Sequence, residues 1–140
     1  MGNLRQQISA KMQATGWMIG SIKIAGEVVI YKTNQVFRDE QNNGMRIYSR
    51  EDPIGNPPDI SYIHVTFADK NVKSGTYSIG GPEIVGAWYH AYGADHDQKA
   101  TSGSVSIERI DDYQVLVGSI RFLTTDFDVA VAYIIKGFSG

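Results

Sequence analysis

The chain has 140 residues, 13 of them basic and 15 acidic, giving a net charge of −2. It contains no cysteine, which excludes disulfides, a thiol nucleophile and cysteine-ligated metals. The basic residues are scattered, so the sequence does not predict a nucleic-acid-binding surface. A chain of this length buries about two-thirds of its unfolded surface, so we expect one self-sufficient domain over residues 1–140.

The N-terminal segment lacks an apolar core followed by small residues, so no signal peptide is predicted in the sequence as written. Residues 3–14 fit either a helix or a strand, and we favour a strand from about Ile8. The longest apolar run, Val129 to Ile135, is seven residues long and too short to cross a bilayer. We therefore expect a soluble protein and leave its compartment open.

From Gly16 onward the sequence predicts short β-strands separated by turn signals. The polar stretch 34–43 is interpreted as a connection that ends in a hairpin turn at Asn42-Asn43-Gly44, because Asn and Gly both accept positive φ. Residues 51–59 hold three of the four prolines and predict a loop. The predicted strands are residues 17–25, 28–31, 45–49, 61–67, 75–80, 84–92, a hairpin within 100–122, and 127–135.

The hairpin within residues 100–122 is the strongest single signal. Its first strand has Gly103, Val105 and Ile107 on one face and serines on the other, and Asp111-Asp112 favours a turn. Its return strand is apolar on both faces, which is typical of a strand inside a sheet. Together these elements predict an all-β domain, an antiparallel β-sandwich or flattened barrel of about 8–10 strands.

Three pieces of sequence occur in a recognisable order: Ser74-Gly75-Thr76-Tyr77-Ser78-Ile79, then Ser102 to Ile107 with Gly118 to Phe122, then a closing Gly137-Phe138-Ser139. This order resembles a family of small bacterial β-sandwich proteins of unknown function, many of them envelope lipoproteins. The resemblance implies a β-sandwich and a cell-envelope or secreted location, without a catalytic set. The chain departs from the family by lacking the lipoprotein signal and its cysteine.

One loop concentrates metal-ligating side chains. Imidazole and carboxylate groups suit zinc and similar ions. This loop could bring together His90, Asp95, His96 and Asp97. Their spacing matches no standard signature, and a solvated loop beside a strand explains the same residues.

Aromatic residues are the second candidate set. We take Trp88, Tyr89 and Tyr92 as candidate ligand-binding residues, because aromatic faces bind sugars and apolar ligands. Trp17, Tyr48 and Tyr62 could extend such a groove, although core packing accounts for most aromatic residues in a sandwich.

No nucleophile elbow or phosphate loop occurs, so no catalytic residue and no cofactor are predicted. We expect a non-enzymatic binding or interaction module for a protein, glycan or small ligand, acting through residues 93–101 and the aromatic strand before them. The alternative is a metal-binding protein or hydrolase centred on the loop from His90 to His96. A third possibility is a structural domain that associates with itself, as a homo-oligomer, at a sheet edge.

Overall fold

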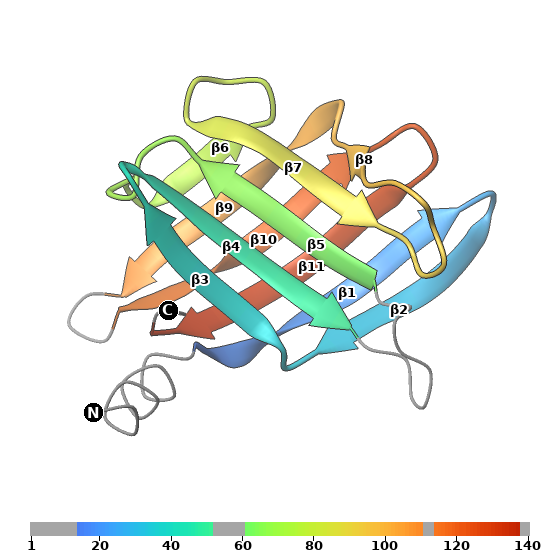
Figure 1. Cartoon of the computed structure of the whole chain (residues 1–140), viewed down its shortest axis with the longest axis horizontal. Coiled ribbons are helices and arrows are strands. Elements are labelled where there is room, and N and C mark those ends of the chain that lie inside the picture. Colours follow the sequence, from blue (N-terminus) through green and yellow to red (C-terminus); the bar gives the residue numbers. More distant parts are fainter. Residues whose placement is uncertain (1–13, 52–60, 111–113, 138–140) are drawn as a thin grey trace.

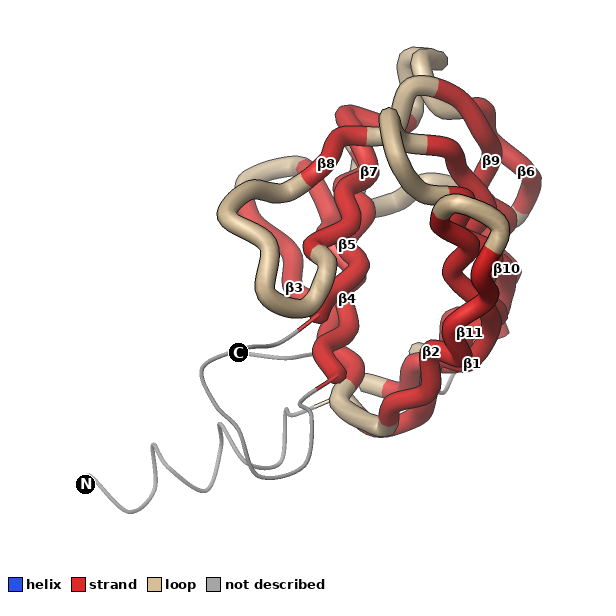
Figure 2. The backbone as a smooth tube through the Cα atoms, turned by 90° about the vertical axis from the view of Figure 1, so that its right-hand side faces the viewer, coloured by secondary structure: helices blue, strands red, loops and turns tan. Residues whose placement is uncertain are grey.

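The computed structural model describes residues 14–51, 61–110 and 114–137. These residues form two antiparallel β-sheets packed face to face as an open sandwich, so the predicted fold class is confirmed (Figures 1 and 2). No helix in the described ranges is long and apolar enough to cross a membrane. The strands are β1 (Thr15–Ile24), β2 (Glu27–Thr33), β3 (Val36–Gln41), β4 (Gly44–Glu51), β5 (Ser61–Phe67), β6 (Gly75–Ser78), β7 (Ile84–His90), β8 (Gln98–Lys99), β9 (Ser102–Ile110), β10 (Val115–Leu123) and β11 (Asp128–Lys136).

The larger sheet has the strand order β2-β1-β11-β10-β9-β6, and the smaller sheet has the order β3-β4-β5-β7-β8. The predicted hairpin is present: β9 and β10 pair from Ser102 opposite Leu123 to Ile110 opposite Val115. β10 lies between β9 and β11, which confirms the interior position expected from its two apolar faces.

Two strands were not predicted. β3 lies in the stretch interpreted as a polar connection, where Arg38 points inward and is only 2% exposed while Phe37 and Asp39 lie on the outer face. A buried arginine hides the apolar alternation by which a strand is recognised. The two-residue β8 is too short to leave any pattern.

The turns follow backbone chemistry. The hairpin turn at Asn42-Asn43 is confirmed, and Asn42 has the positive φ of 56° that asparagine tolerates. The turn between β1 and β2 falls on Ala25-Gly26, with φ of 50° and 83°, one residue before the gap at 26–27 that separates the two predicted strands. Three predictions fall on residues outside the described ranges: the strand preference at Ile8, the proline-rich loop of residues 51–59 beyond Glu51, and the turn at Asp111-Asp112.

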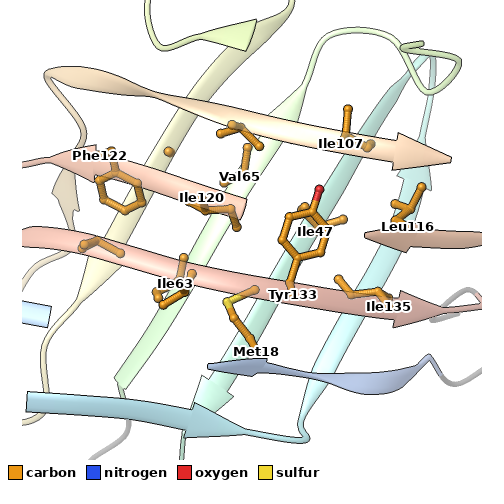
Figure 3. Packing of buried hydrophobic residues seen from close by; sticks show 14 of the residues in the cluster. Met18, Ile47, Ile63, Val65, Ile107, Leu116, Ile120, Phe122, Tyr133 and Ile135 are labelled. Carbon is orange, nitrogen blue, oxygen red and sulfur yellow. The ribbon is translucent and has the colours of Figure 1, made fainter. Parts of the chain in front are cut away.

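The core lies between the sheets and is almost entirely apolar. Figure 3 shows Ile47 and Ile63 of the smaller sheet facing Ile120 and Tyr133 of the larger sheet. Each fully buried aliphatic or aromatic side chain contributes about 1.5–3 kcal/mol. The largest fully buried side chains are Met18, Ile22, Tyr31, Met45, Ile47, Ile63, Phe67, Leu116, Ile120, Phe122, Tyr133 and Ile135.

Polar contacts inside the sandwich join its two layers. The Tyr31 hydroxyl of β2 lies 2.8 Å from the Ser49 hydroxyl of β4, and Ser49 Oγ lies 3.0 Å from Met18 Sδ. Burial raises the pKa of Tyr31, so its hydroxyl stays protonated at any ordinary pH.

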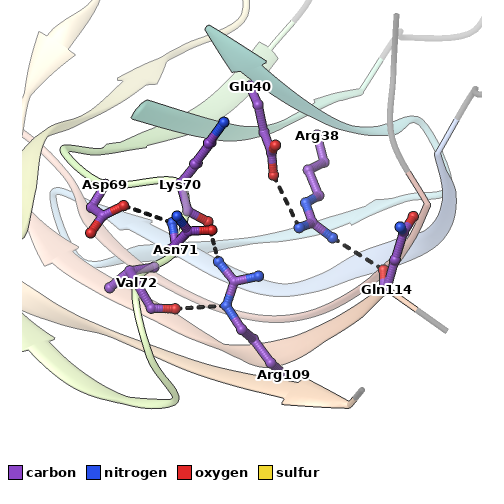
Figure 4. Close-up of polar contacts among 8 residues, drawn as sticks. All are labelled: Arg38, Glu40, Asp69, Lys70, Asn71, Val72, Arg109 and Gln114. Carbon is purple, nitrogen blue, oxygen red and sulfur yellow. Dashed lines mark hydrogen bonds and ion pairs between the residues drawn. The ribbon is translucent and has the colours of Figure 1, made fainter. Parts of the chain in front are cut away.

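Two inward-pointing arginines occupy one end of the sandwich (Figure 4). Arg38 of β3 donates to the backbone carbonyl of Gln114 at 3.1 Å and pairs with Glu40 at 3.3 Å. Arg109 of β9 donates to the carbonyls of Val72, at 2.6 Å, and Lys70. Arg109 thus fastens the connection between β5 and β6 to the larger sheet.

Gly118 of β10 makes room for a contact between its two neighbours. A Cβ at this position would lie 2.0 Å from the Ser106 carbonyl oxygen and 2.9 Å from the Tyr133 hydroxyl. In its absence Tyr133 of β11 reaches across β10 and donates to the Ser106 carbonyl of β9 at 2.8 Å. One glycine therefore allows a hydrogen bond that spans three strands.

We expect Gly118→Ala to lower the free energy of unfolding by about 3 kcal/mol, because the added methyl overpacks against backbone that cannot move aside. Urea unfolding measures the change. Gly75→Ala is the matched control: its Cβ would meet the Tyr77 hydroxyl at an ordinary 3.4 Å, so its effect stays below about 1 kcal/mol. Equal effects of the two substitutions would contradict the steric explanation.

Candidate binding surface

A row of side chains crosses the outer face of the smaller sheet. Phe37 of β3 stands opposite Tyr48 of β4, and Tyr48 stands opposite His64 of β5. His64 stands opposite Trp88 of β7, and Trp88 stands opposite Lys99 of β8. We call these five residues the aromatic row. Neighbouring strands are about 4.8 Å apart, so the row is roughly 19 Å long.

The aromatic row exists because side chains alternate along each strand. In β5, Ile63, Val65 and Phe67 are fully buried in the core, so Tyr62 and His64 must point outward. β4 repeats this arrangement, as does β7 from Gly86 onward, and antiparallel pairing then brings the outward residues into register.

Neighbouring rings in the aromatic row hold one another in place. Phe37 and Tyr48 stack with centroids 4.7 Å apart and planes at 14°, and His64 and Trp88 lie 4.5 Å apart at 35°. The Lys99 ammonium is 5.6 Å from the Trp88 ring. These side chains are partly buried apart from Lys99, which is exposed. The rings form an ordered surface rather than a set of freely rotating groups.

Trp88 lies over a glycine of its own strand. A Cβ at Gly86 would come within 2.5 Å of the Trp88 ring. Gly86 sits two residues before Trp88 and therefore faces the same side of the sheet. The missing side chain leaves the space that the indole fills, so Trp88 lies along the strand.

A second set of polar aromatic contacts borders the aromatic row. Tyr62 and His90 stack with centroids 4.8 Å apart and planes at 3°. Asp97 Oδ1 accepts a hydrogen bond from the Tyr62 hydroxyl at 2.5 Å and lies 2.9 Å from His90 Nδ1. Partial burial, followed by the contact with the Asp97 carboxylate, raises the pKa of Tyr62 to about 12.

The loop 91–97, which follows β7, is fixed at its C-terminal end. Figure 2 shows it curving to the outer side of the smaller sheet. Asp97 fixes it to β5 and β7. The next residue, Gln98, bonds Asp126 Oδ2 at 2.6 Å and Thr124 Oγ1 at 2.7 Å in the turn between β10 and β11.

Two arginines on the outer face bond polar partners beside them. Arg46 pairs with Asp39 at 2.6 Å, and its guanidinium carbon lies 4.4 Å above the Tyr48 ring. Arg50 donates to the Gln35 amide oxygen at 3.1 Å. The face therefore combines aromatic rings with hydrogen-bond donors and acceptors, some of them charged.

The structure separates the three predicted ligand-binding aromatics. Trp88 belongs to the aromatic row. Tyr89 points into the core, where it is 6% exposed and meets Phe127 edge-on at 4.8 Å. Tyr92 is 49% exposed in the loop 91–97.

Of the four predicted metal ligands, the structure brings His90 and Asp97 into contact. Asp95 and His96 are exposed in the loop 91–97. Within the residues that the structure describes, no three His, Cys, Asp or Glu side chains are grouped so that they could hold a metal ion.

Several members of the surface were not singled out from the sequence. Alternation with Ile63 and Val65 puts His64 on a sheet face, but nothing in the sequence gives the cross-strand register that places it beside Trp88. Phe37 was missed together with β3, and Lys99 together with β8. Gly86 carried a usable signal, because a glycine inside a strand often marks a close approach.

Comparison with known proteins finds no match to this chain among protein families, curated proteins or solved structures. The described residues therefore define the chain only as an all-β protein with two antiparallel sheets.

Gly86→Ala should displace the Trp88 indole, because the new methyl would occupy the ring's position. In a Trp17→Phe background Trp88 is the sole tryptophan, and its fluorescence should shift to longer wavelength as the ring moves into water. Gly75→Ala in the same background is the control and should leave the spectrum unchanged. An unshifted spectrum for Gly86→Ala would show that the ring does not depend on the glycine.

Acid should destabilise the fold through His64. Burial, followed by the positive charge of Arg46, lowers the pKa of His64. The unfolded chain then takes up a proton before the folded chain does, so the free energy of unfolding falls as pH drops through about 6.5. Denaturant titrations across this range should give a flatter profile for His64→Gln. The same substitution at the exposed His96 should leave the slope unchanged, and a wild-type slope for His64→Gln would refute the assignment.

Proposed function

We propose that this chain is a non-enzymatic binding module that holds a glycan chain against the aromatic row. The observation that carries the proposal is the alignment of four rings, Phe37, Tyr48, His64 and Trp88, in one cross-strand register on an outer sheet face. Aromatic rings in a β-sandwich usually point into the core, because their exposure to water is unfavourable. A row of rings on an outer face is therefore unusual.

The shape of the surface favours an extended ligand. The aromatic row runs across the strands for roughly 19 Å, longer than a single sugar or a metabolite requires. Sugar rings present C–H groups on their faces and hydroxyls around their edges. Aromatic side chains pack against the former, while well-placed polar groups bond the latter. Asp39, Arg46, Arg50 and Asp97 border the rings and supply such groups.

The charge of the surface favours a ligand without a strong charge. A polyanion is bound by a run of uncompensated cations. Here the Arg46 guanidinium pairs with the Asp39 carboxylate, and the Asp97 carboxylate lies at the border of the row. Mixed signs of this kind suit the many hydroxyls of a neutral glycan better than the phosphates of a nucleic acid.

The proposal gives the residues of the loop 91–97 a positioning role. Asp97 bonds Tyr62 and contacts His90, and these contacts fix the loop beside the aromatic row. In this proposal Asp97 and His90 position the loop and take no part in a chemical reaction. The resemblance to bacterial envelope proteins supports the same ligand class, because the cell envelope is rich in glycans.

A glycan array should identify a ligand, and calorimetry should then show that Trp88→Ala weakens its binding at least tenfold, about 1.4 kcal/mol, through the lost ring face. Trp17→Ala is the matched control: this tryptophan is 47% exposed on the larger sheet, so its loss should leave the affinity unchanged.

Two results would overturn the proposal. One is a bound glycan whose affinity depends on Trp17 and not on Trp88. The other is stoichiometric zinc in the purified protein that is lost on His90→Ala and His96→Ala, with no glycan bound, which would favour the metal-site alternative.

A further inference from the structure

Four strands border the two sheets, and they differ in how they are protected against pairing with another chain. β6 and β8 have only four and two residues. β3 carries the charged run Arg38-Asp39-Glu40. β2 has seven residues, including the uncharged sequence Val28-Val29-Ile30, and lies at the outer border of the larger sheet (Figure 1). β2 is therefore the border strand best suited to pairing.

The apolar residues of β2 are strongly exposed. Val28 is 57% exposed, Val29 is 51% exposed and Ile30 is 64% exposed. The strand has no bulge here, because its pairing with β1 runs without a register shift from Glu27 to Thr33. Exposed, apolar border strands without a bulge are sites where another strand adds to a sheet.

The backbone of β2 shows which groups are available for pairing. The Lys32 N–H donates to Glu51 Oε2 at 3.0 Å, so it points away from β1. Backbone groups alternate in direction along an antiparallel strand, so those of Ile30 and Val28 also point away from β1. In the described part of the chain no hydrogen bond engages these outward groups.

We propose that β2 pairs antiparallel with β2 of a second copy of this chain, about a two-fold axis at Val29. Val28 then stands opposite Ile30 of the second copy, and Ile30 stands opposite Val28 of the second copy. Each of these two residue pairs exchanges two N–H···O=C hydrogen bonds, which gives four in all. The larger sheets of the two copies then form one continuous sheet through the interface. The contact is closed, because both copies use the same strand.

The hydrogen bond by which Glu51 caps the Lys32 N–H selects this register. A two-fold axis at Ile30 would place Val28 opposite Lys32 and would need the Lys32 N–H that Glu51 already occupies. The axis at Val29 leaves the cap intact and places Val28 and Ile30 in apolar cross-strand pairs on the outer face. The second copy is favoured over an unrelated strand because Val28-Val29-Ile30 complements itself in this arrangement.

Cysteine cross-linking tests the register, since the chain has no cysteine of its own. Val29 lies at the axis in a non-hydrogen-bonded pair, where Cα atoms are about 4.5 Å apart, within disulfide range. Val29→Cys should therefore give a covalent dimer on mild oxidation. Ile30→Cys is the control: its diagonal separation of about 7–8 Å is too long for a disulfide.

Sedimentation of the full wild-type chain across a concentration series should show a dimer that dissociates on dilution. Ile30→Pro removes one outward N–H without touching the ladder to β1, so it should give a folded monomer with an unchanged circular dichroism spectrum. Leu123→Ala, at a 47% exposed residue of the interior strand β10, should leave the dimer intact. A wild-type chain that stays monomeric throughout, or cross-linking of Ile30→Cys in place of Val29→Cys, would overturn the proposal.

Discussion

The register of the smaller sheet is the constraint on which both the core and the binding surface depend. Side chains alternate along β4 and β5, and along β7 from Gly86 onward, so a slip of one residue in β5 would bring His64 into the core and turn Ile63 and Val65 out to water. Each of these aliphatic side chains contributes about 1.5–3 kcal/mol when buried, so the slip is strongly disfavoured. The aromatic row on the outer face is therefore held in place by the packing of the inner face.

Glycine plays a similar part in both sheets. Tyr133 extends across Gly118 inside the larger sheet, and Trp88 lies over Gly86 on the outer face of the smaller sheet. In each case a missing side chain gives an aromatic group a defined place, which restricts its rotamers more than packing between flexible neighbours would. The orientation of the largest ring on the proposed binding surface is thus encoded two residues away from the ring itself.

The sequence was sufficient for whatever depends on alternation within one strand. The fold class, the β9–β10 hairpin and the outward position of His64 could all be predicted in this way. Contacts between strands distant in sequence could not, because the pairing of β5 with β7 depends on the whole sheet. β3 was missed for a different reason: Arg38 is buried in the sandwich, so a charged residue stands where the strand pattern requires an apolar one. Tyr89 and Trp88 were treated alike, although adjacent strand residues face opposite sides.

The arginine contacts at one end of the sandwich have a consequence for sequence variation. Arg109 holds the connection after β5 by backbone carbonyl groups, at Val72 and Lys70, rather than by their side chains. Every amino acid supplies the same carbonyl, so the Lys70 side chain is free to change in related chains while the attachment persists. Arg109 itself has no such freedom, since lysine lacks the planar, forked donor geometry. Among homologues of this chain, that arginine should therefore vary much less than the loop it secures.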